Sequence, residues 1–200
     1  MINKKSSPDI SVISAIYNGD IDLIKDSINS IINQSFKNFK YIIVNDASNL
    51  KTKKFLEKIS KEDARILLLS NKHNIGLTKS LNKALKIAKG KLIARLDSDD
   101  IASKRKLEIQ YKYFQNHPDC TLLATNFNFK RDGQLVKINY PEKFKRENIK
   151  KILKHKNIFV HSTVMFKRKE IMQIGCYDPN FKYAQDYDLW LRISENFECH

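Results

Sequence analysis

The run Asp97-Ser98-Asp99-Asp100 puts three carboxylates into four positions, directly after residues 92–96, which are apolar except for Arg95. Carboxylates this close repel one another, and a hard divalent cation that prefers oxygen ligands would offset the repulsion. The alternative is that Asp99 or Asp100 caps a following helix through its side chain. Because similar polar clusters follow other apolar stretches of the chain, we favour a metal site in this acidic run.

Asp46 ends a second apolar stretch, so its carboxylate would face a pocket at the edge of a sheet. A carboxylate can accept the N3–H of uracil or thymine, a hydrogen that cytosine lacks. An Asx-turn that starts the next helix explains Asp46 equally well. Gly76 lies near another helix start, where glycine permits close backbone approach to a ligand or simply begins the helix. The glycine spacing matches neither a dinucleotide fingerprint nor a phosphate-binding loop of the Walker type.

Asp186 lies in the segment Gln185-Asp-Tyr-Asp-Leu-Trp190, about 90 residues after the acidic run. Only the fold can bring it to the other acids. An isolated carboxylate at the start of a helix commonly stabilises that helix and does nothing else. The residues alone therefore leave a catalytic role and a capping role both open.

Two alternating periodicities in the first half predict the elements that position these residues. Short β-rich apolar runs predict strands at 10–16, 40–45, 65–70 and 91–96, and amphipathic patterns predict helices at 20–34, 50–61, 75–88 and 102–116. Such alternation predicts an α/β fold with a mostly parallel sheet. Ligands bind outside the carboxyl ends of the strands in such sheets. The polar clusters at 17–19, 45–48 and 97–100 all fall at such ends.

The second half has a mixed pattern. It predicts a hairpin of residues 121–130 and 135–139 around Asp132-Gly133, followed by a short basic helix at 148–154. A strand at 161–166, a helix at 168–174 that stops at Gly175, and an amphipathic helix at 186–195 complete it. Without repeats or a linker, we expect one domain over residues 1–200, with a first half of 1–117 and a second half of 118–200.

Composition limits the class of protein. At 200 residues, 42% hydrophobic and 30% charged, the chain suits a globular protein, and no stretch has the ~18 apolar residues of a membrane span. The start of the chain lacks the apolar core of a secretory signal. The three cysteines show no metal-ligand spacing and suit a reducing compartment. We therefore expect a cytoplasmic location.

The net charge of +15 raises the question of an anionic partner. Most of the charge is scattered over polar helix faces, but residues 130–156 hold ten Lys/Arg against three acids. No helix-turn-helix, zinc spacing or aromatic RNA-binding signature accompanies it, so we expect no nucleic-acid partner. For this segment we favour an anionic membrane surface, or an anionic glycan.

Taken together, the motifs resemble those of the family-2 glycosyltransferases, and the resemblance extends from Ile10 to about Ile193. Each piece is modestly specific, whereas all of them in this order are highly specific. The pieces are S-V-I-S-A-I-Y-N-G, S-I-N-S-I-I-N-Q-S-F-K-N-F, I-I-V-N-D-A-S, N-I-G-L-T-K-S-L-N, G-K-L-I-A-R-L-D-S-D-D, H-S-T-V-M-F-K-R, G-C-Y-D and Q-D-Y-D-L-W-L-R.

The resemblance implies a GT-A fold, a nucleotide-sugar donor and a role for each candidate residue. Asp97 would contact the ribose or the sugar, Asp99 would hold Mn²⁺ or Mg²⁺ on the diphosphate, and Asp186 would be the catalytic base. His161 would lie toward the acceptor, a glycan or a lipid-linked molecule. The base pocket would be lined by Ala15, Tyr17 and Asp46, with Gly76 in the donor-binding loop.

The chain departs from the family pattern at four positions without losing Asp46, Asp99 or Asp186. Asn45 and Ala47 replace an acid and a glycine, Ala15 stands where proline is common, and Gln185 replaces a glutamate. The family domain normally continues beyond residue 200, so we expect the second half to lack its C-terminal end.

The implied reaction is a single displacement that inverts the anomeric carbon, with Asp186 deprotonating the acceptor hydroxyl. An inactive sugar-nucleotide-binding homologue is the first alternative, but it would tolerate loss of Asp99 or Asp186. A nucleotidyltransferase would need a triphosphate-binding segment that we do not find. A basic nucleic-acid-binding module is the non-enzymatic alternative, and it would show salt-sensitive DNA binding.

Overall fold

The structure is a computed structural model, and it describes residues 7–131, 134–137 and 148–200. The first half confirms the predicted alternation of strands and helices. Its elements are β1 (Ile10–Ile16), α1 (Ile21–Ile32), β2 (Phe39–Asn45), α2 (Leu50–Glu62), β3 (Ile66–Ser70), α3 (Leu77–Ile87), β4 (Leu92–Arg95) and α4 (Lys106–Asn116).

The start of α4 differs from the prediction by four residues. Residues 102–104 are not helical because their backbone groups bond to the end of α1 and the residues after it. The amide of Ala102 donates to Ser30 Oγ, and the carbonyls of Ser103 and Lys104 accept from Gln34 and the Ser35 amide. Since α4 begins at Lys106, neither Asp99 nor Asp100 caps it, and that alternative is wrong.

The second half contains the expected hairpin and helices, with two corrections. Its elements are β5 (Cys120–Leu123), β6 (Asn128–Arg131), β7 (Gln134–Lys137), α5 (Ile149–Leu153), the 3-10 turn η2 (His161–Thr163), β8 (Met165–Lys167), α6 (Arg168–Gln173), α7 (Gln185–Asn196) and β9 (Glu198–Cys199). The strand predicted at 121–130 is divided between β5 and β6, and only β6 pairs with β7. The predicted turn Asp132-Gly133 lies outside the described residues.

The second correction concerns the strand predicted at 161–166. This segment begins as the turn η2, because both the amide and the hydroxyl of Thr163 donate to the carbonyl of Val160. The strand itself is confined to β8. The short helix α6 ends near the expected place, before Gly175, whose φ of 91° favours glycine.

One seven-stranded sheet connects the two halves, in the order β3-β2-β1-β4-β8-β5-β9. Strands β1 to β4 are mutually parallel, whereas β8 pairs antiparallel with both β4 and β5. The mostly parallel α/β sheet with a mixed region in the second half is therefore confirmed. Because β2, β1 and β4 are neighbours, their carboxyl ends lie at one edge of the sheet, as predicted.

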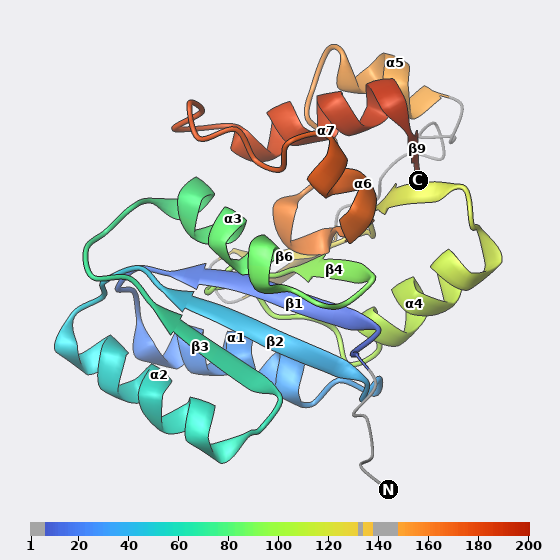
Figure 1. The fold of residues 1–200 in the computed structure, drawn as a ribbon. Coiled ribbons are helices and arrows are strands. Elements are labelled where there is room, and N and C mark those ends of the chain that lie inside the picture. Colours follow the sequence, from blue (N-terminus) through green and yellow to red (C-terminus); the bar gives the residue numbers. More distant parts are fainter. Residues whose placement is uncertain (1–6, 132–133, 138–147) are drawn as a thin grey trace, which may run out of the picture.

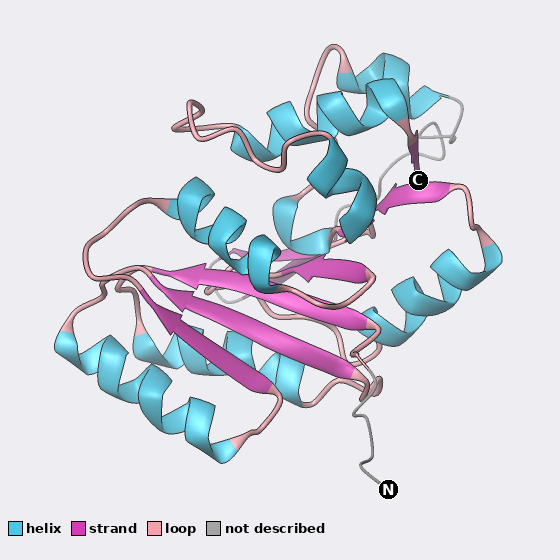
Figure 2. Cartoon of the chain, in the orientation of Figure 1, coloured by secondary structure: helices cyan, strands magenta, loops and turns pink. Residues whose placement is uncertain are grey.

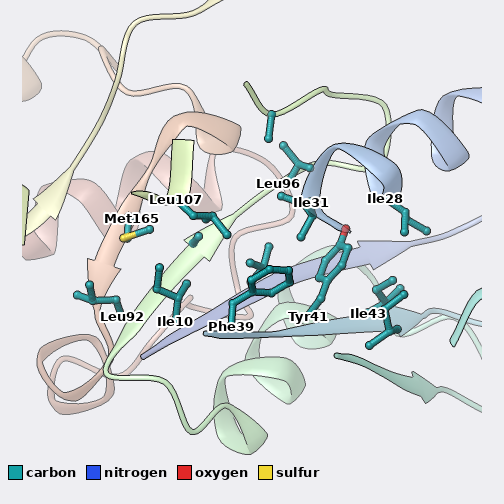
Figure 3. Packing of buried hydrophobic residues seen from close by; sticks show 14 of the residues in the cluster. Ile10, Ile28, Ile31, Phe39, Tyr41, Ile43, Leu92, Leu96, Leu107 and Met165 are labelled. Atoms are coloured by element: carbon teal, nitrogen blue, oxygen red, sulfur yellow. The ribbon is translucent and has the colours of Figure 1, made fainter. Parts of the chain in front are cut away.

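Helices cover both faces of this sheet (Figures 1 and 2). Each face has its own cluster of buried hydrophobic side chains. On one face α1, α2 and α4 pack side chains such as Ile28, Ile31 and Leu107 against Ile10, Tyr41 and Ile43 (Figure 3). On the other face α3, α5, α6 and α7 bury a second cluster that includes Trp190. Among the helices that the structure describes, none is long and apolar enough to cross a membrane.

Candidate active site

The loops that follow β1 and β2 are bonded to each other at the carboxyl edge of the sheet. The amide of Asn18 donates to Ser48 Oγ at 2.9 Å, and the amide of Asn49 donates to Asn18 Oδ1 at 2.8 Å. Two of the candidate residues lie here: Tyr17 is 57% exposed, and Ala15 is half-buried. The exposed ring of Tyr17 is therefore free to contact a ligand.

Asp46, at the end of β2, is buried and accepts three hydrogen bonds. Its Oδ1 accepts from Asn71 Nδ2 at 2.7 Å and from the amide of Ile75 at 2.9 Å, and its Oδ2 accepts from the amide of Gly76 at 2.9 Å. The carboxylate thus fixes the loop that leads into α3. Oδ2 has one protein donor, so it retains acceptor capacity for a further N–H.

Gly76 precedes α3 with a φ of 85°, a conformation that L side chains rarely adopt. A Cβ added there would meet nothing within 4 Å, so the backbone angle, and not crowding, requires glycine. Its amide already bonds to Asp46. The space beside its Cα remains open to a ligand.

Asp97, after β4, is held on both carboxylate oxygens. Its Oδ1 pairs with the guanidinium of Arg95, which is fully buried, and its Oδ2 accepts from Ser162 Oγ at 3.1 Å. Ser162 Oγ in turn accepts from the amide of Asp97 at 2.9 Å. Burial alone would raise the pKa of the Asp97 carboxyl, but Arg95 and Ser162 hold that pKa below its usual value.

Lys106, the first residue of α4, is a second buried cation at this edge. Its Nζ donates to the carbonyl of Arg95 at 2.9 Å and to the carbonyl of Ser162. Burial, and then the charge of Arg95, lower the pKa of Lys106 to about 7. Arg95 and Lys106 therefore offset the repulsion within the acidic run at Asp97. The sequence analysis had assigned that role to a metal ion.

Asp99 and Asp100 are exposed, and no hydrogen bond or ion pair is found for either carboxylate in the part of the chain that the structure describes. The same part contains no group of three or more His, Cys, Asp or Glu placed to hold a metal ion. Mg²⁺-type ions are commonly held by one or two carboxylates together with the phosphates of a substrate. Asp99 fits that arrangement, since its oxygens are unengaged and face water.

His161 lies in η2 and is buried beside the first residues of the acidic run. Its Nε2 forms a hydrogen bond of 2.8 Å with the hydroxyl of Tyr177, and its ring packs edge-on against Trp190 of α7. Burial, and then the charge of Arg95, lower the pKa of His161 to about 3, so the ring is neutral near pH 7. A neutral imidazole bonded to a phenol positions groups around it and carries no charge of its own.

Asp186, in the first turn of α7, is half-buried and accepts one hydrogen bond, from Asn157 Nδ2 at 3.2 Å. Asp188 differs sharply, because its Oδ2 accepts from Arg192 Nε at 3.0 Å and Nη2 at 2.6 Å. Arg192 also donates to the carbonyls of Ile174 and Cys176, so Asp188 belongs to a structural network. Asp186 is the less engaged of the two carboxylates.

Tyr177 connects the turn η2 with α3. Its hydroxyl bonds to His161, and its backbone is held by the side chain of Asn82 on α3 at 2.7 and 3.1 Å. Burial raises the pKa of the Tyr177 hydroxyl, and the charge of Arg95 offsets part of that rise. Tyr177 therefore fixes His161 as a neutral partner in this wall of the site.

The structure thus joins Asp97 directly to Ser162, the residue that follows His161, and Asp46 directly to Gly76. Sequence reasoning missed five residues that hold these candidates in place: Arg95, Lys106, Ser162, Tyr177 and Asn157. Arg95 gave one signal, a charge inside an otherwise apolar strand. The others required the tertiary structure.

The basic segment 130–156 is described only in part. On and after α5, the side chains of Lys150, Lys151 and Lys154 are exposed, which fits an anionic surface. Residues 132–133 and 138–147, which carry three of its ten Lys and Arg residues, lie outside the described residues.

Comparison with known proteins shows which family this chain matches. Residues 11–175 match the Glycosyl transferase family 2. An uncharacterized glycosyltransferase of Methanocaldococcus jannaschii is 39% identical over 98% of this chain and 68% of its own length. The O-antigen biosynthesis glycosyltransferase WbnJ of Escherichia coli is 37% identical over 92% of this chain and 71% of its own length.

Solved structures agree on the fold. TarS 1-349 of S. aureus in complex with UDP has a TM-score of 0.76 at 22% identity, covering 96% of this chain and 57% of that one. The mannosyltransferase PcManGT of Pyrobaculum calidifontis, in complex with GDP-Man and Mn²⁺, has a TM-score of 0.73 at 18% identity over 98% of this chain and 55% of that one. The fold is therefore GT-A.

The sheet and its flanking helices define the class of the protein as one with the GT-A fold. The chain belongs to glycosyltransferase family 2. It spans a little over half the length of these solved structures and about two thirds of the curated relatives.

Proposed function

We propose that this protein transfers a sugar from a nucleoside diphosphate sugar to a hydroxyl acceptor, with inversion at the anomeric carbon and with the help of a divalent cation. The single observation that carries the proposal is the contrast between two carboxylates, Asp97 and Asp186. Asp97 is fixed by Arg95 and Ser162, whereas Asp186 accepts one hydrogen bond, from the side-chain amide of Asn157. Two carboxylates in different surroundings can take different roles in one reaction.

The donor would lie over the carboxyl edge of β1, β2 and β4. Asp46 Oδ2 retains capacity to accept the N3–H of uracil, and Tyr17 offers an exposed ring beside it. Ala15 would line the same pocket, and the open side of Gly76 would admit the nucleotide. Asp97 would contact the ribose or the sugar. A relative that binds UDP supports uridine as the base.

Asp99 would hold Mn²⁺ or Mg²⁺ through its exposed carboxylate. When bound, such an ion neutralises charge on the diphosphate leaving group. The Mn²⁺ present with PcManGT supports this assignment. The chain's own contribution is to keep Asp97 engaged with Arg95, which leaves the carboxylates of Asp99 and Asp100 available to the ion. The resemblance to the family favours Asp99 of these two.

Asp186 would accept the proton of the acceptor hydroxyl. It lies at the first turn of α7, where the helix favours a charged carboxylate. Asp188 is bound by Arg192, which favours Asp186 for this role. His161, neutral and bonded to Tyr177, would shape the wall between donor and acceptor.

The acceptor would be a glycan or a lipid-linked molecule. Relatives in O-antigen and teichuronic acid biosynthesis support a role in polysaccharide synthesis. The exposed lysines around α5 would meet an anionic membrane surface, where each basic residue contributes about 1 kcal/mol. That contact would place the protein at the inner face of a membrane.

A thermal-shift panel tests the donor and the metal together. We expect uridine or thymidine diphosphate to stabilise the protein only with Mn²⁺ or Mg²⁺ present, by about 2.7 kcal/mol at ~100 times the dissociation constant. Asp99→Ala should abolish the metal dependence while leaving the unliganded protein as stable as wild type. No stabilisation by any nucleotide with either ion would refute the donor assignment. Metal dependence that persists in Asp99→Ala would place the ion elsewhere.

A further inference from the structure

Two cations are buried under the carboxylate that would meet the donor. Arg95 is fully buried and Lys106 is 8% exposed, yet only one carboxylate, Asp97, forms an ion pair with either of them among the described residues. Removing a charge from water costs several kcal/mol per ion unless hydrogen bonds compensate. A methionine at position 106 would pack beside Leu107 on this face of α4 without that cost.

The hydrogen bonds of the two cations form a closed ring. Lys106 Nζ binds the carbonyls of Arg95 and Ser162, the Arg95 guanidinium binds Asp97 Oδ1, and Ser162 Oγ bonds to both the amide and Oδ2 of Asp97. The ring joins three elements: the end of β4, the turn η2 and the start of α4. It is the direct link between the acidic run and the segment that carries His161.

We propose that Lys106 is a positioning residue for Asp97, acting through Ser162 and the backbone of Arg95 to fix the donor-binding carboxylate relative to the acceptor-side turn η2. The inference rests on the proposed function. In this arrangement Lys106 touches neither donor nor acceptor. It sets the place of the carboxylate that does.

The charged groups around Lys106 come from each element packed against it. Arg95 of β4 repels the ammonium, and Asp97 and Asp100 of the following run attract it, while His161 of η2 is neutral near pH 7. The two carbonyl acceptors can be bound by the amine in either protonation state. The ring therefore persists whether Lys106 is charged or neutral.

Loss of Lys106 should disturb the position of Asp97 more than it disturbs binding of the nucleotide base or of the metal. Without its Nζ, the carbonyl of Ser162 loses its donor, and η2 loses one of the hydrogen bonds that hold it beside β4, while the bond from Gln110 to the carbonyl of Thr163 remains. Asp97 would then keep Arg95 but lose the fixed contact to Ser162. Asp46 and Asp99, which are not members of the ring, would be unaffected.

A double-mutant cycle with Lys106→Met and Ser162→Ala tests the proposal. The dissociation constant of uridine diphosphate sugar with Mn²⁺ is measured by calorimetry on the folded proteins. We expect each single variant to bind the donor about tenfold more weakly, and the double variant to bind no more than about twofold more weakly than either single. The exposed neighbour variant Lys104→Met, the matched control, should bind as wild type does. Additive losses, or Lys106→Met binding like Lys104→Met, would overturn the proposal.

A second measurement does not depend on the donor. Hydrogen exchange of the Asp97 amide, which donates to Ser162 Oγ, is compared with that of Ile93 inside β4. We expect Lys106→Met to accelerate exchange at Asp97 far more than at Ile93. Equal acceleration at both amides would reveal general destabilisation and would overturn the positioning role. If wild type binds no donor, the proposed function fails, and this measurement still decides the role of Lys106.

Discussion

The proposed donor side and the proposed acceptor side of the site hold their carboxylates in different ways. Asp46, at the donor end, is buried and accepts three hydrogen bonds from a single loop only 25 to 30 residues further along the chain. Asp186, at the acceptor end, is half-buried and accepts one bond of 3.2 Å from Asn157. The proposed donor side is thus fixed before any ligand binds. Asp186, the proposed base, accepts one hydrogen bond, so its carboxylate oxygens keep capacity to accept others. The contrast predicts different consequences of mutation at the two ends.

The largest effect should come from Asp186→Asn. General-base catalysis supplies about 10²–10⁴ in rate, so turnover should fall by that factor. Stability should hardly change, because the asparagine can keep a hydrogen bond with Asn157. Turnover is measured as release of nucleoside diphosphate in the presence of acceptor, on the protein with any C-terminal continuation that it has.

Asp188→Asn is the matched control for that variant. Because Asp188 bonds to Arg192, its substitution should lower the stability and leave turnover of the folded protein near wild type. If Asp188→Asn loses turnover while Asp186→Asn keeps it, the base has been assigned to the wrong residue.

Asp46→Ala should show the next largest effect, and on the opposite property. It leaves the amides of Ile75 and Gly76 without their acceptor in partly buried surroundings, and Asn71 Nδ2 keeps only Ser80 Oγ. We expect the free energy of unfolding to fall by about 2–3 kcal/mol, and stabilisation by uridine diphosphate to disappear. Denaturant unfolding with and without nucleotide measures both.

The control lies in the same loop. Asn74 is exposed, and its amide is 3.5 Å from the carbonyl of Asp46, so Asn74→Ala should change stability little. An Asp46→Ala protein as stable as Asn74→Ala would show that the hydrogen bonds of Asp46 do not order the donor-side loop before a ligand binds.

The smallest effect is a dependence of stability on pH. Because the pKa of Lys106 is about 7 in the folded protein and near its usual value of 10.5 when unfolded, the unfolded state binds more protons above pH 7. Stability should therefore rise with pH from about 7, by at most about 1.4 kcal/mol per pH unit. Lys106→Met should remove this rise, whereas Lys104→Met should keep it.

The contribution of Lys106 to the pH dependence of stability is best measured between about pH 7 and 8.5. Below this window, His161 contributes a rise between pH 3 and its usual value of 6.5, and above it the buried thiols of Cys120 and Cys199, whose pKa burial raises to about 12, oppose the rise. Identical slopes for wild type and Lys106→Met inside this window would contradict a buried, titrating lysine.

Sequence patterns anticipated the fold where burial is periodic. The strands of the first half and the helix faces of α1 and α3 followed from their apolar spacing, and the order of the motifs gave the family. The candidate acids at strand ends followed from the same reasoning, because parallel strands deliver their carboxyl ends to one edge.

Patterns failed where a distant partner decides the local structure. The start of α4 moved because the end of α1 and the residues after it bind the backbone of residues 102–104, and η2 replaced part of a strand because Thr163 bonds back to Val160. The buried cations were missed for the same reason: a lysine at a helix start reads as a surface residue until β4 and η2 are placed against it.

The antiparallel pairing of β4 with β8 has a consequence for the path of the chain. The pairing sets Ala94 opposite Met165, so the residues that enter β8 pass beside the end of β4. Ser162 and Asp97 each lie three residues from that pair, and two segments 65 residues apart in the sequence therefore meet at the acidic run. The strand pairing brings the two segments together, and on the proposed role of Lys106 the ring of hydrogen bonds then sets their relative position.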